Sequence, residues 1–104
     1  MSVFNPVPGA TYGTATINFG AAPGANEASV AVTGQTLITA GAKCVAFIMG
    51  DDTSSNHTAG DHKYFEMFVN ISCGTPSAGT GFTIYARSQH KMTGNWTVRY
   101  FWIN

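Results

Sequence analysis

Two segments of the chain are apolar on both faces of a strand, and this feature constrains the fold most. In residues 43–49 (KCVAFIM) and 96–103 (WTVRYFWI), apolar side chains occur at odd and even positions alike. A strand in a two-layer sandwich buries only one face, and 104 residues leave little chain for a third layer. The second face is therefore covered by copies of the chain in a closed symmetric assembly, or by the N-terminal segment of the same chain.

The remaining apolar pattern has a period of two, which is typical of half-buried strands. It predicts strands at residues 13–19, 28–33, 35–39, 62–73 and 82–88, separated by Gly- and Pro-containing loops. In residues 62–73, the positions expected to face inward are Phe65, Met67, Val69, Ile71 and Cys73. We therefore expect an all-β chain, a single β-sandwich or jelly-roll-like domain of about seven or eight short antiparallel strands.

The first twelve residues differ from the rest, since Pro6, Pro8 and Gly9 disfavour a packed strand. Residues 1–12 are predicted to form an extended N-terminal arm, and residues 13–104 the β-sandwich domain. Such an arm can add a strand to the sheet edge of a neighbouring molecule. Nothing in the composition indicates a second domain.

The charge composition excludes several classes of partner. Five basic and five acidic residues give a net charge of zero, and only 10% of residues are charged, against roughly 25% in an average soluble protein. A nucleic-acid or anionic membrane surface needs concentrated positive charge, and neither a transmembrane run nor a signal-peptide pattern is present. A surface with so few charges is poorly protected against association, which favours an assembled protein.

The most polar stretch, residues 50–62, supplies candidate ligands in Asp51, Asp52, His57, Asp61 and His62. Carboxylates and imidazoles bind zinc or calcium, but the spacing matches neither a zinc nor a calcium motif. A solvated loop with turn hydrogen bonds is the simpler interpretation, so we expect no metal or other cofactor.

The same loop is also a candidate recognition site. Together with the aromatic residues Tyr64, Tyr85 and Trp102, it is a candidate surface for binding a glycan. Cross-strand packing is the alternative role for each tyrosine.

Catalytic motifs are missing from the sequence. No Gly-x-Ser-x-Gly turn or phosphate-binding loop occurs, and neither cysteine is expected in a cationic, exposed setting. We expect a protein that is not an enzyme. Cys44 and Cys73 are predicted to be buried free thiols that act as small hydrophobes, with a disulfide as the alternative.

Four segments carry a resemblance to known proteins: VAVTGQ at 30–35, AGAKCVA at 40–46, AGTGFTIYA at 78–86 and GNWTVRYFW at 94–102. Their order resembles short bacteriophage and prophage virion-associated proteins over roughly residues 13–103. The Gly-Phe pair and the Trp-bearing last strand are also similar to the closing strands of trimeric, H-type-lectin-like sugar-binding modules. Neither group supplies a catalytic residue.

The resemblance implies a virion structural protein, assembled in the bacterial host cytoplasm. It would be a capsid decoration or cement protein, or a small tail-associated module. Its expected partners are copies of itself, in a homotrimer, and the major capsid or tail proteins. Candidate interface residues are Phe4, Val45, Phe47, Met49, Arg99, Phe101 and Ile103. The alternative is a glycan- or ion-binding recognition module.

Overall fold

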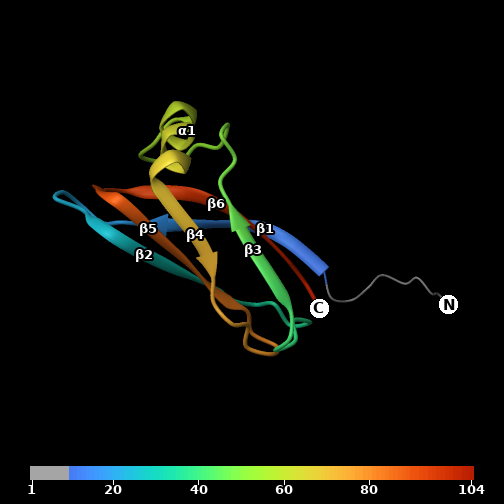
Figure 1. The fold of residues 1–104 in the computed structure, drawn as a ribbon. Helices are drawn as coiled ribbons and strands as arrows, with labels where there is room; N and C mark the ends of the chain where they lie inside the picture. Colours follow the sequence, from blue (N-terminus) through green and yellow to red (C-terminus); the bar gives the residue numbers. More distant parts are fainter. Residues whose placement is uncertain (1–9) are drawn as a thin grey trace.

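The computed structural model describes residues 10–104, which form two three-stranded antiparallel sheets and one helix (Figure 1). The first sheet has the order β1 (Ala10–Asn18), β6 (Asn95–Ile103), β3 (Lys43–Phe47). The second has the order β2 (Ala25–Val32), β5 (Phe82–Met92), β4 (Val69–Cys73). The helix α1 (Ala59–Phe68) lies between β3 and β4 in the chain. The described residues are thus mostly β, but not entirely.

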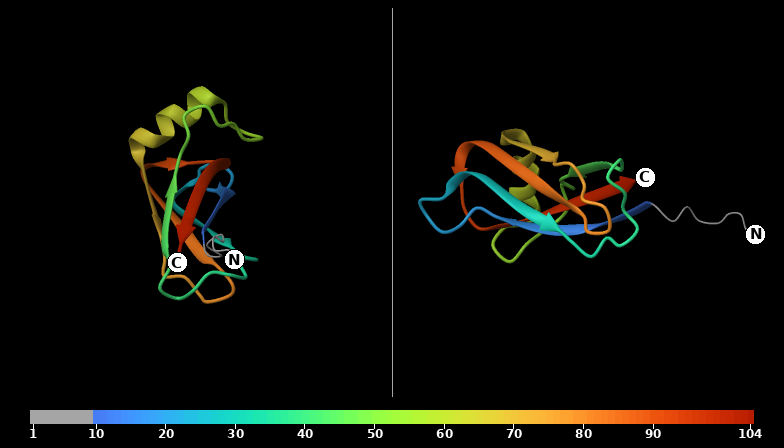
Figure 2. Two further views of the ribbon diagram at one scale, coloured as in Figure 1. Left: turned by 90° about the vertical axis from the view of Figure 1, so that its right-hand side faces the viewer. Right: turned by 90° about the horizontal axis from the view of Figure 1, so that it is seen from below.

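The two sheets face each other, with β1 beside β2 and β3 beside β4 (Figure 2). β6 pairs with β1 along its whole length, whereas β3 pairs only with Arg99–Ile103 of β6. The turn at Thr93 and Gly94 carries the chain from β5 in the second sheet directly to β6 in the first. Among the residues that the structure describes, the first half of β6 therefore has no strand neighbour on its β3 side.

The core lies between the sheets and is built from the inward positions of the alternating pattern. It includes Ile17, Val32, Ile84, Val98 and Trp102, all buried, as the period of two predicts.

One inward position of β1 is a glycine. Gly13 lies opposite Tyr100 of β6, and a Cβ atom at this position would come within 2.5 Å of the Tyr100 hydroxyl. The missing side chain leaves room for the aromatic ring, so the glycine is compatible with a buried strand here.

The predicted strand over residues 62–73 is wrong in its first half. α1 occupies this segment up to Phe68, and only residues 69–73 form a strand. A capping box starts the helix: the Asp61 N–H donates to Thr58 Oγ1, and the Thr58 N–H donates to Asp61 Oδ2. Met67, expected to face inward, is exposed, while His62 and Phe65 form the buried side of the helix.

The strand count and the arm also need correction. Residues 35–39 form a turn in which the Ile38 N–H donates to the Gln35 carbonyl, so the described part of the chain has six strands where seven or eight were expected. Residues 10–12, assigned to the arm, are part of β1. The rest of the arm, including Phe4, lies outside the described residues.

The two cysteines are free thiols, as predicted, although each is half-buried rather than fully buried. Cys44 belongs to the first sheet and Cys73 to the second, and both pack against the core. Burial raises the pKa of Cys73 to about 11 and also raises that of Cys44. Within residues 10–104, no helix is long and apolar enough to cross a membrane.

Candidate functional site

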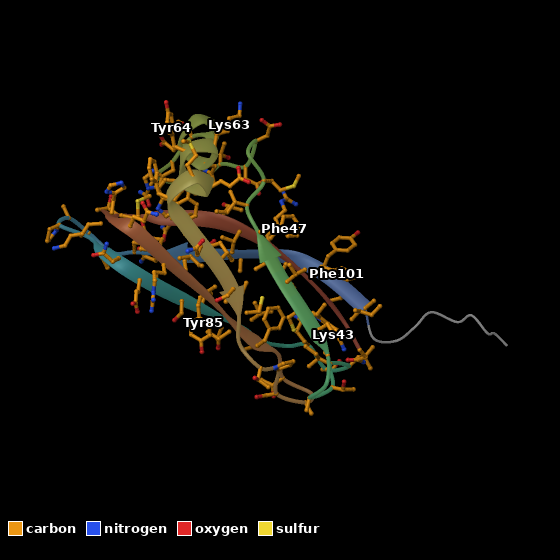
Figure 3. The ribbon with its side chains drawn as sticks, in the orientation of Figure 1. Lys43, Phe47, Lys63, Tyr64, Tyr85 and Phe101 are labelled. Atoms are coloured by element: carbon orange, nitrogen blue, oxygen red, sulfur yellow. The ribbon has the colours of Figure 1, made fainter. Side chains whose placement is uncertain are left out.

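The outward side of the first sheet carries a group of exposed apolar side chains, which we call the apolar face. Its members, with their exposed fractions, are Tyr12 (82%), Val45 (52%), Phe47 (41%), Phe101 (37%) and Ile103 (41%). The strand register makes them neighbours, because Tyr12 and Val45 flank Phe101 on either side. Figure 3 shows Phe47 and Phe101 on this side of the molecule.

Within residues 10–104, β3 and β6 carry apolar side chains on both of their sides, and the outward ones are exposed. In β6, Trp96, Val98 and Trp102 are buried, while Phe101 and Ile103 on the other side of the strand remain exposed. Met49, two residues beyond the end of β3, is also exposed. No described segment of the chain covers these side chains. Contiguous exposed apolar groups of this kind are typical of interaction surfaces.

An ion pair lies at the border of the apolar face. The Arg99 guanidinium donates two hydrogen bonds to the Asp52 carboxylate, from Nε at 2.9 Å and from Nη2 at 2.7 Å. These bonds hold the pKa of Asp52 below its ordinary value. In the strand register, Arg99 lies between Thr14 of β1 and Phe47 of β3. The ion pair with Asp52 therefore neutralises the Arg99 charge beside the apolar side chains.

The polar loop before α1 takes the place that β3 leaves beside β6. The Thr97 hydroxyl donates to the Thr53 carbonyl at 2.7 Å, and the Asn95 N–H donates to Asn56 Oδ1 at 2.9 Å. The Ser54 hydroxyl donates to the Asn95 carbonyl. The loop is rich in hydrogen-bonding side chains because it supplies partners for the unpaired edge of a strand.

Two histidines of the candidate recognition loop are also structural. His62 is fully buried, with Nδ1 2.9 Å from the Thr58 carbonyl and Nε2 accepting from the Thr97 N–H at 3.1 Å. His57 stacks on Trp96 with ring centroids 3.6 Å apart, and its two nitrogens face the Thr93 carbonyl and Asp61. The imidazoles thus join α1 and its preceding loop to β6.

The remaining residues of the candidate recognition loop do not converge on a site. Asp61 caps α1, Asp52 is bound to Arg99, and the exposed Asp51 lies 4.0 Å from Lys63 Nζ. Among residues 10–104, no three potential ligands lie close enough together to hold a metal ion.

The aromatic residues expected near this loop are spread over different surfaces. Tyr64 is exposed on α1, and Tyr85 is exposed on the outward side of the second sheet (Figure 3). The prediction that Trp102 is available for recognition is wrong, because Trp102 is buried and donates its indole N–H to Gln35 Oε1.

Comparison with known proteins adds no relative: no family model, curated protein or solved structure matches the chain.

Proposed function

We propose that the chain is a non-enzymatic structural subunit of a bacteriophage virion, which assembles with copies of itself through the apolar face. It would act as a capsid decoration protein or as a small tail-associated module. The observation that carries the proposal is the row formed by Tyr12, Phe101 and Val45 across three adjacent strands, which remains exposed in a single copy.

The physical reason for self-association is the burial of apolar area. Each Å² of apolar surface removed from water contributes about 25 cal/mol, and the five side chains of the apolar face lie together on one sheet. Two charged residues border the face: Arg99 is paired with Asp52, and the exposed Lys43 lies opposite Ile103. Covering the face with a second copy would therefore leave the Arg99 charge compensated, while the long Lys43 side chain can keep its ammonium group in water at the end of β3.

The chemistry of the chain also supports a structural role. With zero net charge and only 10% charged residues, the chain has weak electrostatic protection against association. The polar side chains of the 50–62 loop form hydrogen bonds to β6 and α1. The resemblance to virion-associated proteins points to the same role, with a homotrimer as the expected assembly.

Sedimentation equilibrium over a range of protein concentrations tests self-association. We expect an oligomer at micromolar concentration and a thermal stability that rises with protein concentration. Replacing two directly opposed residues, Val45→Glu and Phe101→Glu, should produce a folded monomer, because both side chains point outward. Tyr64→Glu is the matched control, since Tyr64 is exposed on α1, away from the apolar face.

The outcome of this experiment is decisive for the assembly. A wild-type chain that stays monomeric throughout the concentration range, with constant thermal stability, would refute it. Equal loss of association in the Tyr64→Glu control would show that the apolar face is not the interface. The virion role has a separate test, since the subunit should be located at the capsid or tail in an electron-microscopy map of the purified particle.

A further inference from the structure

The outward side of the second sheet is hollowed into a groove of about 720 Å³, which we call the polar groove. It crosses all three strands, β2, β5 and β4, and is formed by a different set of residues from the apolar face. Its outward side chains are Glu27, Ser29, Asn70, Ser72, Tyr85 and Arg87.

The strand register arranges these side chains in two rows. In one row, Arg87 of β5 lies between Glu27 and Asn70; in the other, Tyr85 lies between Ser29 and Ser72. Adjacent strands lie about 5 Å apart, and outward residues of one strand repeat about every 7 Å. Five hydrogen-bonding side chains therefore surround a single aromatic ring.

The ring of Tyr85 is left open to solvent by its small neighbours. Its residue is 50% exposed, and the flanking positions across the sheet are serines. At the end of β4, a Cβ atom on Gly74 would lie 3.0 Å from the Tyr85 ring, so the absence of a side chain there gives the ring its room. The exposed part of the aromatic ring can therefore contact a ligand.

The charges of the polar groove cancel. Arg87 Nη2 lies 3.2 Å from Glu27 Oε2, and these are the only ionised side chains among the lining residues. A groove without net charge does not attract phosphates or nucleic acid. Its guanidinium donates hydrogen bonds, its carboxylate accepts them, and its amide and hydroxyls do both.

We propose that the polar groove binds a neutral oligosaccharide, with a sugar ring stacked on Tyr85. A pyranose has C–H groups on its face, which suit an aromatic ring, and hydroxyls around its edge, which both donate and accept hydrogen bonds. Arg87, Glu27 and Asn70 would bind hydroxyls on one side of the stacked sugar. Ser29 and Ser72 would bind sugar hydroxyls that point along the row through Tyr85, across the sheet.

The proposal goes beyond the structural role and does not depend on it. The polar groove and the apolar face are the outward sides of two sheets that pack against each other, so they point in opposite directions. Association through the apolar face would leave the groove of every copy accessible. Several weak sites on one assembly would then bind a glycan-coated surface with increased avidity.

The test is an NMR titration of the ¹⁵N-labelled full chain with four separate neutral probes: maltotriose, lactose, mannotriose and chitotriose. We expect at least one probe to cause saturable shifts, with millimolar affinity, that include the amides of Tyr85, Arg87 and Asn70. Tyr85→Thr, which places another strand-favouring residue at this position, should weaken binding by about fivefold to tenfold. Tyr85→Phe should retain the stacking and most of the affinity.

Two controls separate this proposal from the assembly and from loss of folding. Tyr64→Thr removes an exposed tyrosine elsewhere and should leave binding unchanged. The Val45→Glu, Phe101→Glu double variant should keep the affinity per subunit even if it is monomeric. Failure of all four probes to cause saturable shifts would overturn the proposal. Shifts that map to another surface, or full binding by a folded Tyr85→Thr variant, would overturn it too.

Discussion

The two outward sheet faces of the molecule are built on the same strand geometry but carry different chemistry. On the first sheet, the central row is Tyr12, Phe101 and Val45, whereas on the second it is Ser29, Tyr85 and Ser72. Most inward positions of both sheets are apolar. Burial of the inward side chains thus drives folding. The outward side chains determine which kind of partner or ligand each sheet can contact.

The same contrast appears in the two arginine–carboxylate pairs. The Asp52 side chain is only 12% exposed and accepts two hydrogen bonds from Arg99, beside the apolar face. Glu27 and Arg87, in the polar groove, are both largely exposed and meet at a single 3.2 Å contact. The first pair is fixed in place, while the second remains available to exchange its hydrogen bonds with a ligand.

The largest expected effect is a difference in stability between a variant at an inward position of β5 and a variant at an outward position of the same strand. Ile84→Ala removes a fully buried side chain from β5 and should lower the free energy of unfolding by about 3 kcal/mol. Tyr85→Thr, at the next residue, should change it by less than about 0.5 kcal/mol. Urea unfolding of both variants, compared at one protein concentration, measures the difference. Similar losses in the two variants would contradict the assignment of Tyr85 to an outward, functional position.

A second prediction concerns the reactivity of the Cys73 thiol, which packs against the core between the two sheets. Because burial raises the pKa of Cys73 to about 11, alkylation of this thiol at pH 8 should be at least about tenfold slower in the folded than in the unfolded chain. The raised pKa also favours folding at a pH below the unfolded value of 9.0, and this stability is lost as the pH rises from 9 towards 11. Mass spectrometry after iodoacetamide pulses measures the first effect, and thermal unfolding over the pH series, with Cys73→Ala as the control, measures the second. Equal rates in the two states would contradict the buried position of the thiol.

The two ion pairs provide a third prediction of smaller size. A double-mutant cycle with Asp52→Asn and Arg99→Gln should give a coupling energy of about 1 kcal/mol, since the geometry is bidentate and half-buried. The matched cycle with Glu27→Gln and Arg87→Gln should give less than about 0.5 kcal/mol. A larger coupling in the second cycle would reverse the contrast drawn between the pairs.

The Asp52–Arg99 pair also predicts a pH dependence. The pKa of Asp52 is held below its ordinary value of 3.8. The ion pair therefore makes its full contribution to the free energy of unfolding at any pH above this value. This contribution should be lost as the pH falls below about 3.8 and Asp52 becomes protonated in the folded state. The Asp52→Asn variant should lack this part of the acid-induced loss of stability, as measured by thermal unfolding between pH 2 and pH 6.

The smallest effect concerns salt. Sulfate strengthens apolar burial, so moderate sodium sulfate should increase association through the apolar face by a few-fold in sedimentation experiments. The Val45→Glu, Phe101→Glu variant should show no such increase. Association that weakens steadily with added salt would indicate an electrostatic interface instead.

The sequence allows much of the two-sheet arrangement to be predicted, because the period of two is regular in β1, β2, β5 and β6. It also predicts the exposed apolar face, since Val45, Phe47, Phe101 and Ile103 alternate with buried or half-buried residues. The helix was missed although Thr58 and Asp61 form a capping pair and His62, Phe65 and Val69 recur at spacings of three and four. In so short a segment, Phe65 and Val69 satisfy both periods, so periodicity alone cannot decide.

The polar groove could not be predicted from the sequence in the same way. Glu27, Asn70 and Arg87 become neighbours only because β5 lies between β2 and β4. Strand order is not encoded in local alternation. The structural use of Asp52 and His62 is likewise a tertiary effect, since it depends on where β3 stops pairing with β6.

The hydrogen bonds of His62 make a single side chain join two segments of the molecule. The ring accepts the Thr97 N–H at one nitrogen and faces the Thr58 carbonyl with the other, so it connects β6 to the start of α1. A residue without a ring acceptor at this position would leave the Thr97 N–H without its partner and would attach α1 less firmly to the first half of β6. The two sheets would keep their own ladders of hydrogen bonds while this one corner of the molecule loosened.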